Sequence, residues 1–253
     1  MTDRPYKKPP ITEAVIEVRF GQPIELAQRS RFMADFALLY PHEQSIRSLE
    51  VAVHVPAAAN EQPVEQTAQI SPQVGHRRSS TDLTEILLLW PTNFVVSQLA
   101  PYPGWESFFA RFTRDWTRWK RVAGYRTITR IGVRFINRID IPISGGIVEE
   151  AEYLTVFPKL PDTFGPLTGY GVQVQMPVRD IECNLIINSS AVPSPLLQHG
   201  SLMLDIDIAK DTNVPQSDDE IYILLNRVRI KKNEIFEACV TDKARELFQK
   251  WPA

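Results

Sequence analysis

Arginines are the side chains in this chain best placed to do chemistry, because they occur in two regularly spaced sets. One set recurs at three- or four-residue intervals through a helix predicted to begin near Pro103, and the other occupies every fourth position of a strand predicted over 129–142. A basic helix face or strand face can attract a phosphate backbone or an acidic partner. The predicted binding residues are Arg111, Arg114, Arg118, Arg121, Arg130, Arg134 and Arg138.

Both arginine sets also have a structural interpretation. The helical set can be a solvated face, because the chain as a whole is not basic and has a net charge of −2. For the strand set, acidic side chains alternate on two other predicted strands, at Glu13 and Glu17 and at Asp205 and Asp207. Pairing between them would make a structural ladder. The functional alternative has the arginines binding a phosphate or nucleotide while the acids hold a divalent metal.

Familiar catalytic and metal-binding motifs are missing from the sequence. It has no phosphate-cradling glycine loop, no Gly-x-Ser-x-Gly elbow and no histidine pair at zinc spacing. The two cysteines, Cys183 and Cys239, have no histidine at ligand spacing and are predicted to be buried thiols. We therefore predict neither a metal site nor a cofactor.

Composition sets limits on the class of protein. The chain has 253 residues, of which 43% are hydrophobic and 23% charged, which does not require a nucleic-acid partner. The first residues carry no apolar stretch that could serve as a secretory signal, so a cytoplasmic location is predicted. Segment 86–105 lacks charged side chains, but Pro91, Pro101 and Pro103 interrupt it. A spanning helix needs about 20 apolar residues, so no membrane association is predicted.

Periodicity predicts the elements that must position these side chains. Apolar residues alternate over 14–20 and 129–142, as expected for strands with one wetter face. The helix that begins near Pro103 is predicted to bury an aromatic stripe opposite its arginines. Ser217 and Thr241 are typical helix caps and predict two further helices near the end of the sequence. The aromatic stripe consists of Trp105, Phe108, Phe109, Phe112, Trp116 and Trp119.

A short sequence similarity suggests an internal duplication. The segment from Ile16 to Phe20 is similar to the segment from Ile131 to Phe135, 115 residues further on, and the same offset relates the helix starts near Pro103 and Asp218. We therefore predict an α+β protein of two pseudo-repeats, 1–125 and 126–253, fused in one compact body. Each would run strand, helix or short replacement, antiparallel meander and long helix, with the helices packed on one sheet face.

Several motifs resemble those of a known family. They are Lys8-Pro9-Pro10-Ile11-Thr12-Glu13-Ala14, Tyr102-Pro103-Gly104-Trp105 followed by Phe108, the strand Thr129-Arg130-Ile131-Gly132-Val133-Arg134-Phe135-Ile136-Asn137-Arg138-Ile139, and Phe236-Glu237-Ala238 to Thr241-Asp242. Together they resemble a sporadically distributed family of uncharacterised bacterial and archaeal proteins, over nearly the whole chain. The chain departs from it at Arg78, where an aromatic is usual, and at Phe135, where tyrosine is commoner. The resemblance implies no activity, but the scattered occurrence is similar to that of defence or toxin and antitoxin genes.

These observations favour a non-enzymatic binding or regulatory module that contacts a protein or nucleic-acid partner, in a defence or toxin and antitoxin setting. The alternative is a metal-dependent enzyme acting on a nucleotide or phosphoester. In that case Arg134 and Arg138 would bind the phosphate, and Asp205, Asp207 or Glu17 would hold the metal. A third interpretation is a structural subunit of a larger assembly.

Overall fold

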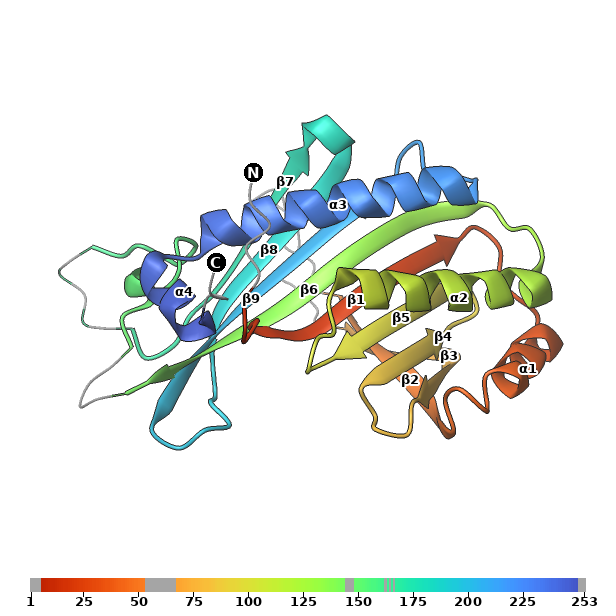
Figure 1. The fold of residues 1–253 in the computed structure, drawn as a ribbon, viewed down its shortest axis with the longest axis horizontal. Helices are drawn as coiled ribbons and strands as arrows, with labels where there is room; N and C mark the ends of the chain where they lie inside the picture. The colour runs from red at the N-terminus through yellow and green to blue at the C-terminus, as the bar shows by residue number, and fades with distance from the viewer. Residues whose placement is uncertain are drawn as a thin grey trace.

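The fold is one antiparallel β-sheet with helices packed against it (Figure 1). The structure is a computed structural model that describes residues 6–52, 67–143, 148–161, 163, 165 and 167–249. Within these residues the chain forms nine β-strands and four α-helices. The strands are β1 (Ile11–Phe20), β2 (His42–Ala52), β3 (Thr67–Ser79), β4 (Glu85–Leu89), β5 (Asn93–Leu99), β6 (Ile128–Pro142), β7 (Gly171–Val178), β8 (Cys183–Val192) and β9 (His199–Lys210). The helices are α1 (Leu26–Asp35), α2 (Trp105–Ala123), α3 (Asp218–Cys239) and α4 (Asp242–Phe248), with single 3-10 turns at η1 (Glu150–Glu152) and η2 (Arg179–Ile181).

The sheet is continuous, with the strand order β2-β3-β4-β5-β1-β6-β9-β8-β7. The predicted α+β class is confirmed, but the predicted architecture of two pseudo-repeats is wrong. The first half contributes five strands and an α-helix after β1, whereas the second contributes four strands. In the described part of the chain between β6 and β7, the only helical turn is η1. The predicted boundary at 125 falls in the connection between α2 and β6.

The similarity between the segments at Ile16 and Ile131 has a local cause. They lie in β1 and β6, which are antiparallel neighbours in the middle of the sheet, with Ile16 opposite Val133 and Val18 opposite Ile131. Directly paired residues project from the same face of a sheet, so both strands need apolar side chains on one face and charged side chains on the other. Their common position in the sheet explains the shared pattern.

The hydrophobic core lies between the sheet and α2 and α3. Phe20 of β1 stacks on Trp119 of α2 with ring centroids 4.2 Å apart, and Lys232 of α3 lies over the ring of Phe135 in β6. Ala14 of β1 pairs with Phe135, so α2 and α3 cover the same sheet face, as Figure 1 shows. The predicted aromatic stripe of α2 is confirmed as core, except that Phe109 is only partly buried.

The hydrogen bonds at the starts of α3 and α4 are those expected from the capping residues in the sequence. The hydroxyl of Ser217 accepts a hydrogen bond from the backbone N–H of Glu220 at the start of α3, and Thr241 accepts one from Ala244 at the start of α4. Both predicted caps are therefore confirmed. Among the described residues, no helix is both long enough and apolar enough to cross a membrane.

Candidate functional site: a cleft at the start of β1

The arginines of α2 are mostly part of the protein's packing. Arg111 is buried, and its guanidinium donates to the backbone carbonyl of Ser97 at 2.7 Å and to the hydroxyl of Tyr40 at 3.2 Å. Arg114 donates to the carboxylate of Asp115 at 2.7 Å. Helix α1 also packs against α2.

Arg111, Arg114, Asp115 and Tyr40 form one connected group, here called the Tyr40 cluster. The carboxylate of Asp115 and the phenol of Tyr40 are both fully buried. Tyr40 donates a short hydrogen bond to the carboxylate of Asp115. Burial, followed by the neighbouring Asp115 charge, raises the pKa of Tyr40 well above its usual value. Further along α2, the guanidinium of Arg118 lies 5.7 Å from the ring centroid of Phe36, and Arg121 is exposed. The four α2 arginines therefore do not form one open basic surface, and their role in binding stays a prediction.

The arginines of β6 lie on the opposite face of the sheet, in a charged ladder made of Arg130, Arg134, Arg138, Glu17, Asp140, Asp205 and Asp207. Arg130 bridges Glu17 and Asp207, the latter at 3.2 Å. Arg134 makes a two-pronged contact with Asp205, at 2.8 and 2.7 Å. Arg138 donates to Asp140, two residues along its own strand, at 2.9 Å. The pairing of Arg130 and Arg134 matches the ladder interpretation.

The acids of the ladder have little capacity left for a metal. Asp205 is 1% exposed, and its carboxylate accepts from Arg134 and from the amide of Asn188 at 2.9 Å. Burial raises the pKa of Asp207, although Arg130 opposes that shift. Across the described ranges there is no group of three or more His, Cys, Asp or Glu side chains that could hold a metal ion.

The two cysteines are buried, as predicted. Burial raises the pKa of Cys183 and of Cys239 to about 11. Both are therefore thiols at neutral pH, and the reactive thiolate is disfavoured.

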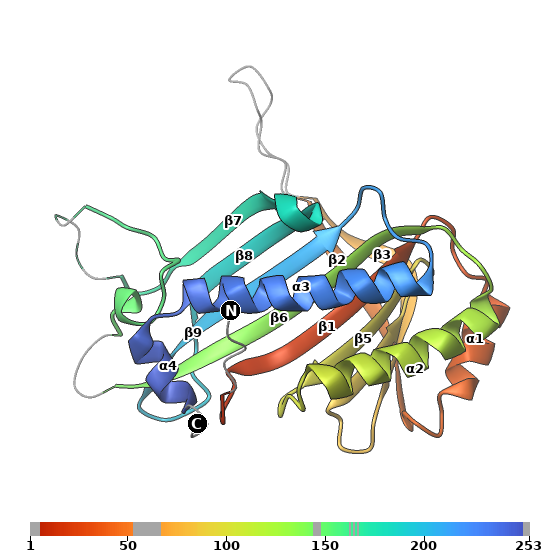
Figure 2. The same ribbon diagram turned by 45° about the horizontal axis from the view of Figure 1, so that its top comes forward.

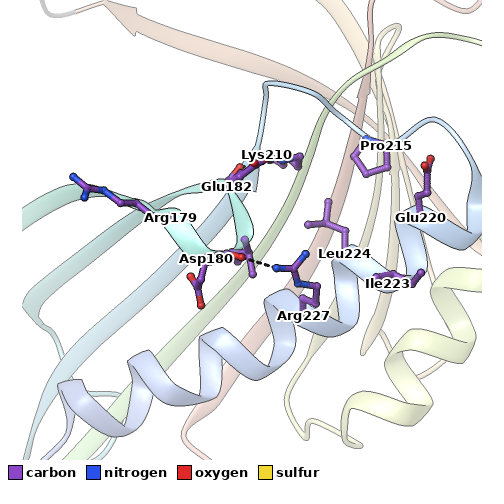
Figure 3. Close-up of a pocket in the computed structure, with 10 residues that line it drawn as sticks. Arg179, Asp180, Glu182, Lys210, Pro215, Glu220, Ile223, Leu224 and Arg227 are labelled. Atoms are coloured by element: carbon purple, nitrogen blue, oxygen red, sulfur yellow. Dashed lines mark hydrogen bonds and ion pairs between the residues drawn. The ribbon is translucent and has the colours of Figure 1, made fainter.

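A small cavity lies where η2 meets α3, and several of its charged side chains already have protein partners (Figure 3). Its volume is about 340 Å³. Arg227 of α3 donates to the carbonyl of Asp180 at 2.5 Å, and Lys210 is 3.1 Å from the carboxylate of Glu182. Lys231 binds the carboxylate of Asp180 at 2.6 Å. These contacts link the turn to α3, which indicates a structural role.

A larger cavity, here called the end cleft, lies where the N-terminal segment meets α2 and α3. Its volume is about 560 Å³. Figure 2 shows its surroundings, with the beginning of β1 between α4 and the beginning of α2. The lining comes from the N-terminal segment (Tyr6, Lys7, Pro9, Pro10 and Ile11), from residues 102–106, from Phe135 and Asn137 of β6, and from Arg229, Lys232, Asn233, Phe236 and Glu237 of α3.

The start of α2 lines the end cleft with Gly104, Trp105 and Glu106. Gly104 is its N-cap residue, with φ of +99°, and makes no side-chain cap hydrogen bond. A helix start carries partial positive charge and has N–H groups without partners inside the helix. A Cβ added at Gly104 would have only a Glu106 carboxylate oxygen within 4 Å, at 3.9 Å. The space beside this backbone is therefore open to a ligand.

Cations predominate among the charged side chains of the cleft. Lys7, Arg229 and Lys232 line it, against Glu106 and Glu237. The ammonium of Lys232 lies 4.1 Å from the ring centroid of Phe135. A carboxylate oxygen of Glu106 is 3.6 Å from Arg229, and that acid is 80% exposed.

The carboxylate of the second acid, Glu237, accepts hydrogen bonds from two neighbouring side chains. Its carboxylate accepts from the hydroxyl of Tyr6 at 2.7 Å and from Nε of Arg245 at 2.9 Å. The pairing with Arg245 offsets its negative charge.

Sequence reasoning did not find this site, because its lining comes from four separate segments. Parts of the motifs that carry the family resemblance meet there, namely Pro9-Pro10-Ile11, Tyr102-Pro103-Gly104-Trp105, Phe135 with Asn137, and Phe236-Glu237. The signal in the sequence that could have indicated the site is the set of motifs itself, because segments far apart in the sequence that carry one resemblance can line one site. No protein-family model matches this chain, and no curated protein matches it.

Proposed function

We propose that this chain is a non-enzymatic binding or regulatory module whose ligand site is the end cleft and whose ligand carries negative charge. The observation that carries this proposal is the combination, in one cavity, of three cationic side chains with an uncapped helix start. Backbone N–H groups at a helix start bind phosphate or carboxylate oxygens, and nearby cations strengthen that attraction.

The geometry supports an anionic group on a compact ligand better than an extended nucleic acid. Binding along a phosphate backbone needs a continuous basic track. In the charged ladder, each β6 arginine is paired with a carboxylate, and Arg111 and Arg114 of α2 are held in the Tyr40 cluster. A protein partner, a cytoplasmic location and a defence or toxin and antitoxin setting stay predictions.

The enzyme alternative has less support than binding. It required Asp205, Asp207 or Glu17 to hold a metal beside phosphate-binding arginines. Each of these three carboxylates instead accepts hydrogen bonds from an arginine of β6. A metal ion would have to displace those arginines, which would leave their charges unpaired on the sheet.

The test is binding of inorganic phosphate to the full chain, measured by calorimetry and by the rise in melting temperature. Lys232→Gln removes one cation from the cleft, and Arg121→Gln is the matched control, because it removes a cation from an exposed position on α2. A hydrogen bond to a charged group contributes about 1.5–3 kcal/mol, so Lys232→Gln is expected to weaken binding about tenfold or more.

The control variant Arg121→Gln is expected to bind phosphate as the unmodified chain does. Equal binding by all three proteins would place the anion elsewhere and overturn the proposal. No binding to the unmodified chain at millimolar phosphate would do the same. Circular dichroism of each variant confirms that a loss of binding is not a loss of fold.

A further inference from the structure

We infer that two copies of this chain pair through the outer edge of β7, in antiparallel orientation, so that one sheet continues across both molecules. β7 is the last strand in the sheet order, and in the part of the chain that the structure describes no further strand pairs with it. Figure 2 shows β7 at the margin of the sheet, beyond β8. The inference is independent of the end cleft, whose described lining includes no residue of β7.

The backbone groups that face this edge belong to alternate residues of β7, among them Gln173 and Gln175. The carbonyl of Tyr170, one residue before β7, accepts from the N–H of Ala191 in β8 at 3.2 Å. Backbone groups alternate between the two sides of a strand, so those of the odd-numbered residues point away from β8. Pro177 is odd-numbered too, as expected of a residue without an N–H on an edge strand.

β7 differs from the strand at the opposite edge of the sheet in having no charged side chain. The other edge strand, β2, contains Glu43, Arg47 and Glu50. Natural sheets commonly block their open edges with charged side chains or proline, because an open edge is a template for another strand. In β7 only Pro177, near the end of the strand, provides such a block. The stretch 171–176 is therefore suited to pairing.

The sequence of β7 is complementary to its own reverse, which favours a second copy as the partner. With Val174 on the two-fold axis, Val172 lies opposite Met176 of the other copy, and Gln173 lies opposite Gln175. Apolar side chains then meet apolar ones, amides meet amides, and no like charges meet. The outward backbone groups of the paired glutamines can bond to each other. A two-fold interface requires self-complementarity of this kind.

Pairing would also cover an exposed apolar side chain. Met176 lies opposite Leu185 of β8, which is 3% exposed and belongs to the hydrophobic core. Directly paired residues share one face of a sheet, so Met176 lies on the core face. It is nevertheless 44% exposed, because the sheet ends at β7. Val172 of a second copy would lie beside it and remove apolar surface from water.

The first experiment is sedimentation velocity of the full chain over a wide range of concentration. A single strand pair is a small interface, so the range should run from about 1 to 500 µM. The expected result is a reversible monomer–dimer equilibrium. Gln173→Pro is expected to raise the dissociation constant about tenfold or more, because it removes an outward N–H. That N–H faces away from β8, so the variant should keep its fold, which circular dichroism checks.

A pair of charge variants tests whether β7 pairs with itself. One chain carries Gln173→Lys with Gln175→Lys, and the other carries Gln173→Glu with Gln175→Glu; both positions are exposed. Each chain alone is expected to stay monomeric at concentrations where the unmodified chain is a dimer, because like charges lie opposite each other. An equimolar mixture of the two chains is expected to dimerise, since opposite charges then face each other.

The control adds the same charge at a distance from β7. Gln22→Lys with Ser30→Lys, at two exposed positions, is expected to leave the dissociation constant unchanged. An unmodified chain that stays monomeric throughout the range would overturn the inference and leave the edge to a strand of a different protein. A dimer that persists in each charge variant would place the interface elsewhere. Charge variants whose mixture stays monomeric would show that β7 does not pair with itself.

Discussion

At the residue scale, Arg134 and Arg138 show how neighbours with the same chemistry can differ in importance. Both belong to the charged ladder on β6 and both bind a carboxylate with two nitrogens. The partner of Arg134 is Asp205, which is 1% exposed, whereas Arg138 is 37% exposed and its partner Asp140 is 23% exposed. A buried carboxylate depends on its cation far more than a hydrated one does.

We expect Arg134→Ala to lower the free energy of unfolding by about 2–3 kcal/mol, because it leaves the Asp205 charge buried with Asn188 as a remaining donor. Arg138→Ala is the matched control. It should cost no more than about 1 kcal/mol, since Asp140 also accepts from Ser201 and is reached by water. Urea unfolding of both variants measures the difference, and equal losses would contradict the asymmetry.

Tyr40 makes the stability of the folded protein depend on pH at alkaline pH. Its folded-state pKa is raised by burial and by Asp115, so the folded protein retains the phenol proton at a pH where the unfolded chain loses it. The stabilisation from this group is complete below the ordinary tyrosine pKa of about 10 and falls as the pH rises above it.

Thermal unfolding from pH 8 to 11.5 should therefore show a decline above about pH 10 that is shallower in Tyr40→Phe. The variant should also be less stable at neutral pH by about 1–3 kcal/mol, because Asp115 loses a buried donor. Curves of identical slope for the two proteins would show that Tyr40 is not responsible for the decline.

At the element scale, the start of α2 depends on a conformation that side chains disfavour. Gly104 has φ of +99° and ψ of 163°, a region occupied almost exclusively by glycine. Gly104→Ala is expected to cost about 1–3 kcal/mol in unfolding free energy. Gly171→Ala on β7 serves as control, because a Cβ there meets nothing within 4 Å and the φ is not positive. A loss of similar size at both positions would rule out backbone strain as the cause.

Elements were predictable from the sequence where the signal is local. The 3.6-residue spacing of aromatics in α2 and the caps at Ser217 and Thr241 depend on neighbours within a few residues, and the structure confirms them. The environment of Arg111 was not predictable, because its partner Tyr40 lies 71 residues away in the sequence.

The candidate site was only partly accessible from the sequence. Alternation on β1, β6 and β9 indicated that arginines and acids could pair, and two of the three β6 arginines pair as that interpretation required. The partner of Arg138 was missed because it lies on the same strand. The end cleft was missed because charge and ring patterns along one element do not show which other segments converge where β1 begins.

At the scale of the whole molecule, the two halves share one sheet through the β1–β6 pair. Residues 1–125 expressed alone would keep β1 paired with β5 but leave its other edge bare, along with the side of α2 that contacts α3 through Trp105 and Asn226. Exposed edges and apolar surfaces associate. We expect this fragment to form aggregates or oligomers in size-exclusion chromatography, and a stable folded monomer would contradict that expectation.

The central position of β1 has a consequence for synthesis of the chain. Val96, the β5 partner of Ile16, is made 80 residues after it, and Val133, its β6 partner, 117 residues after it. At roughly 5–20 residues per second, the middle of the sheet waits on the order of 6–23 s for its second neighbour. During the last 2–7 s or so of that interval, β1 can be paired on one side only. A nascent chain in that state presents a strand edge in the crowded space beside the ribosome, so its yield in a cell should depend on how quickly β6 follows.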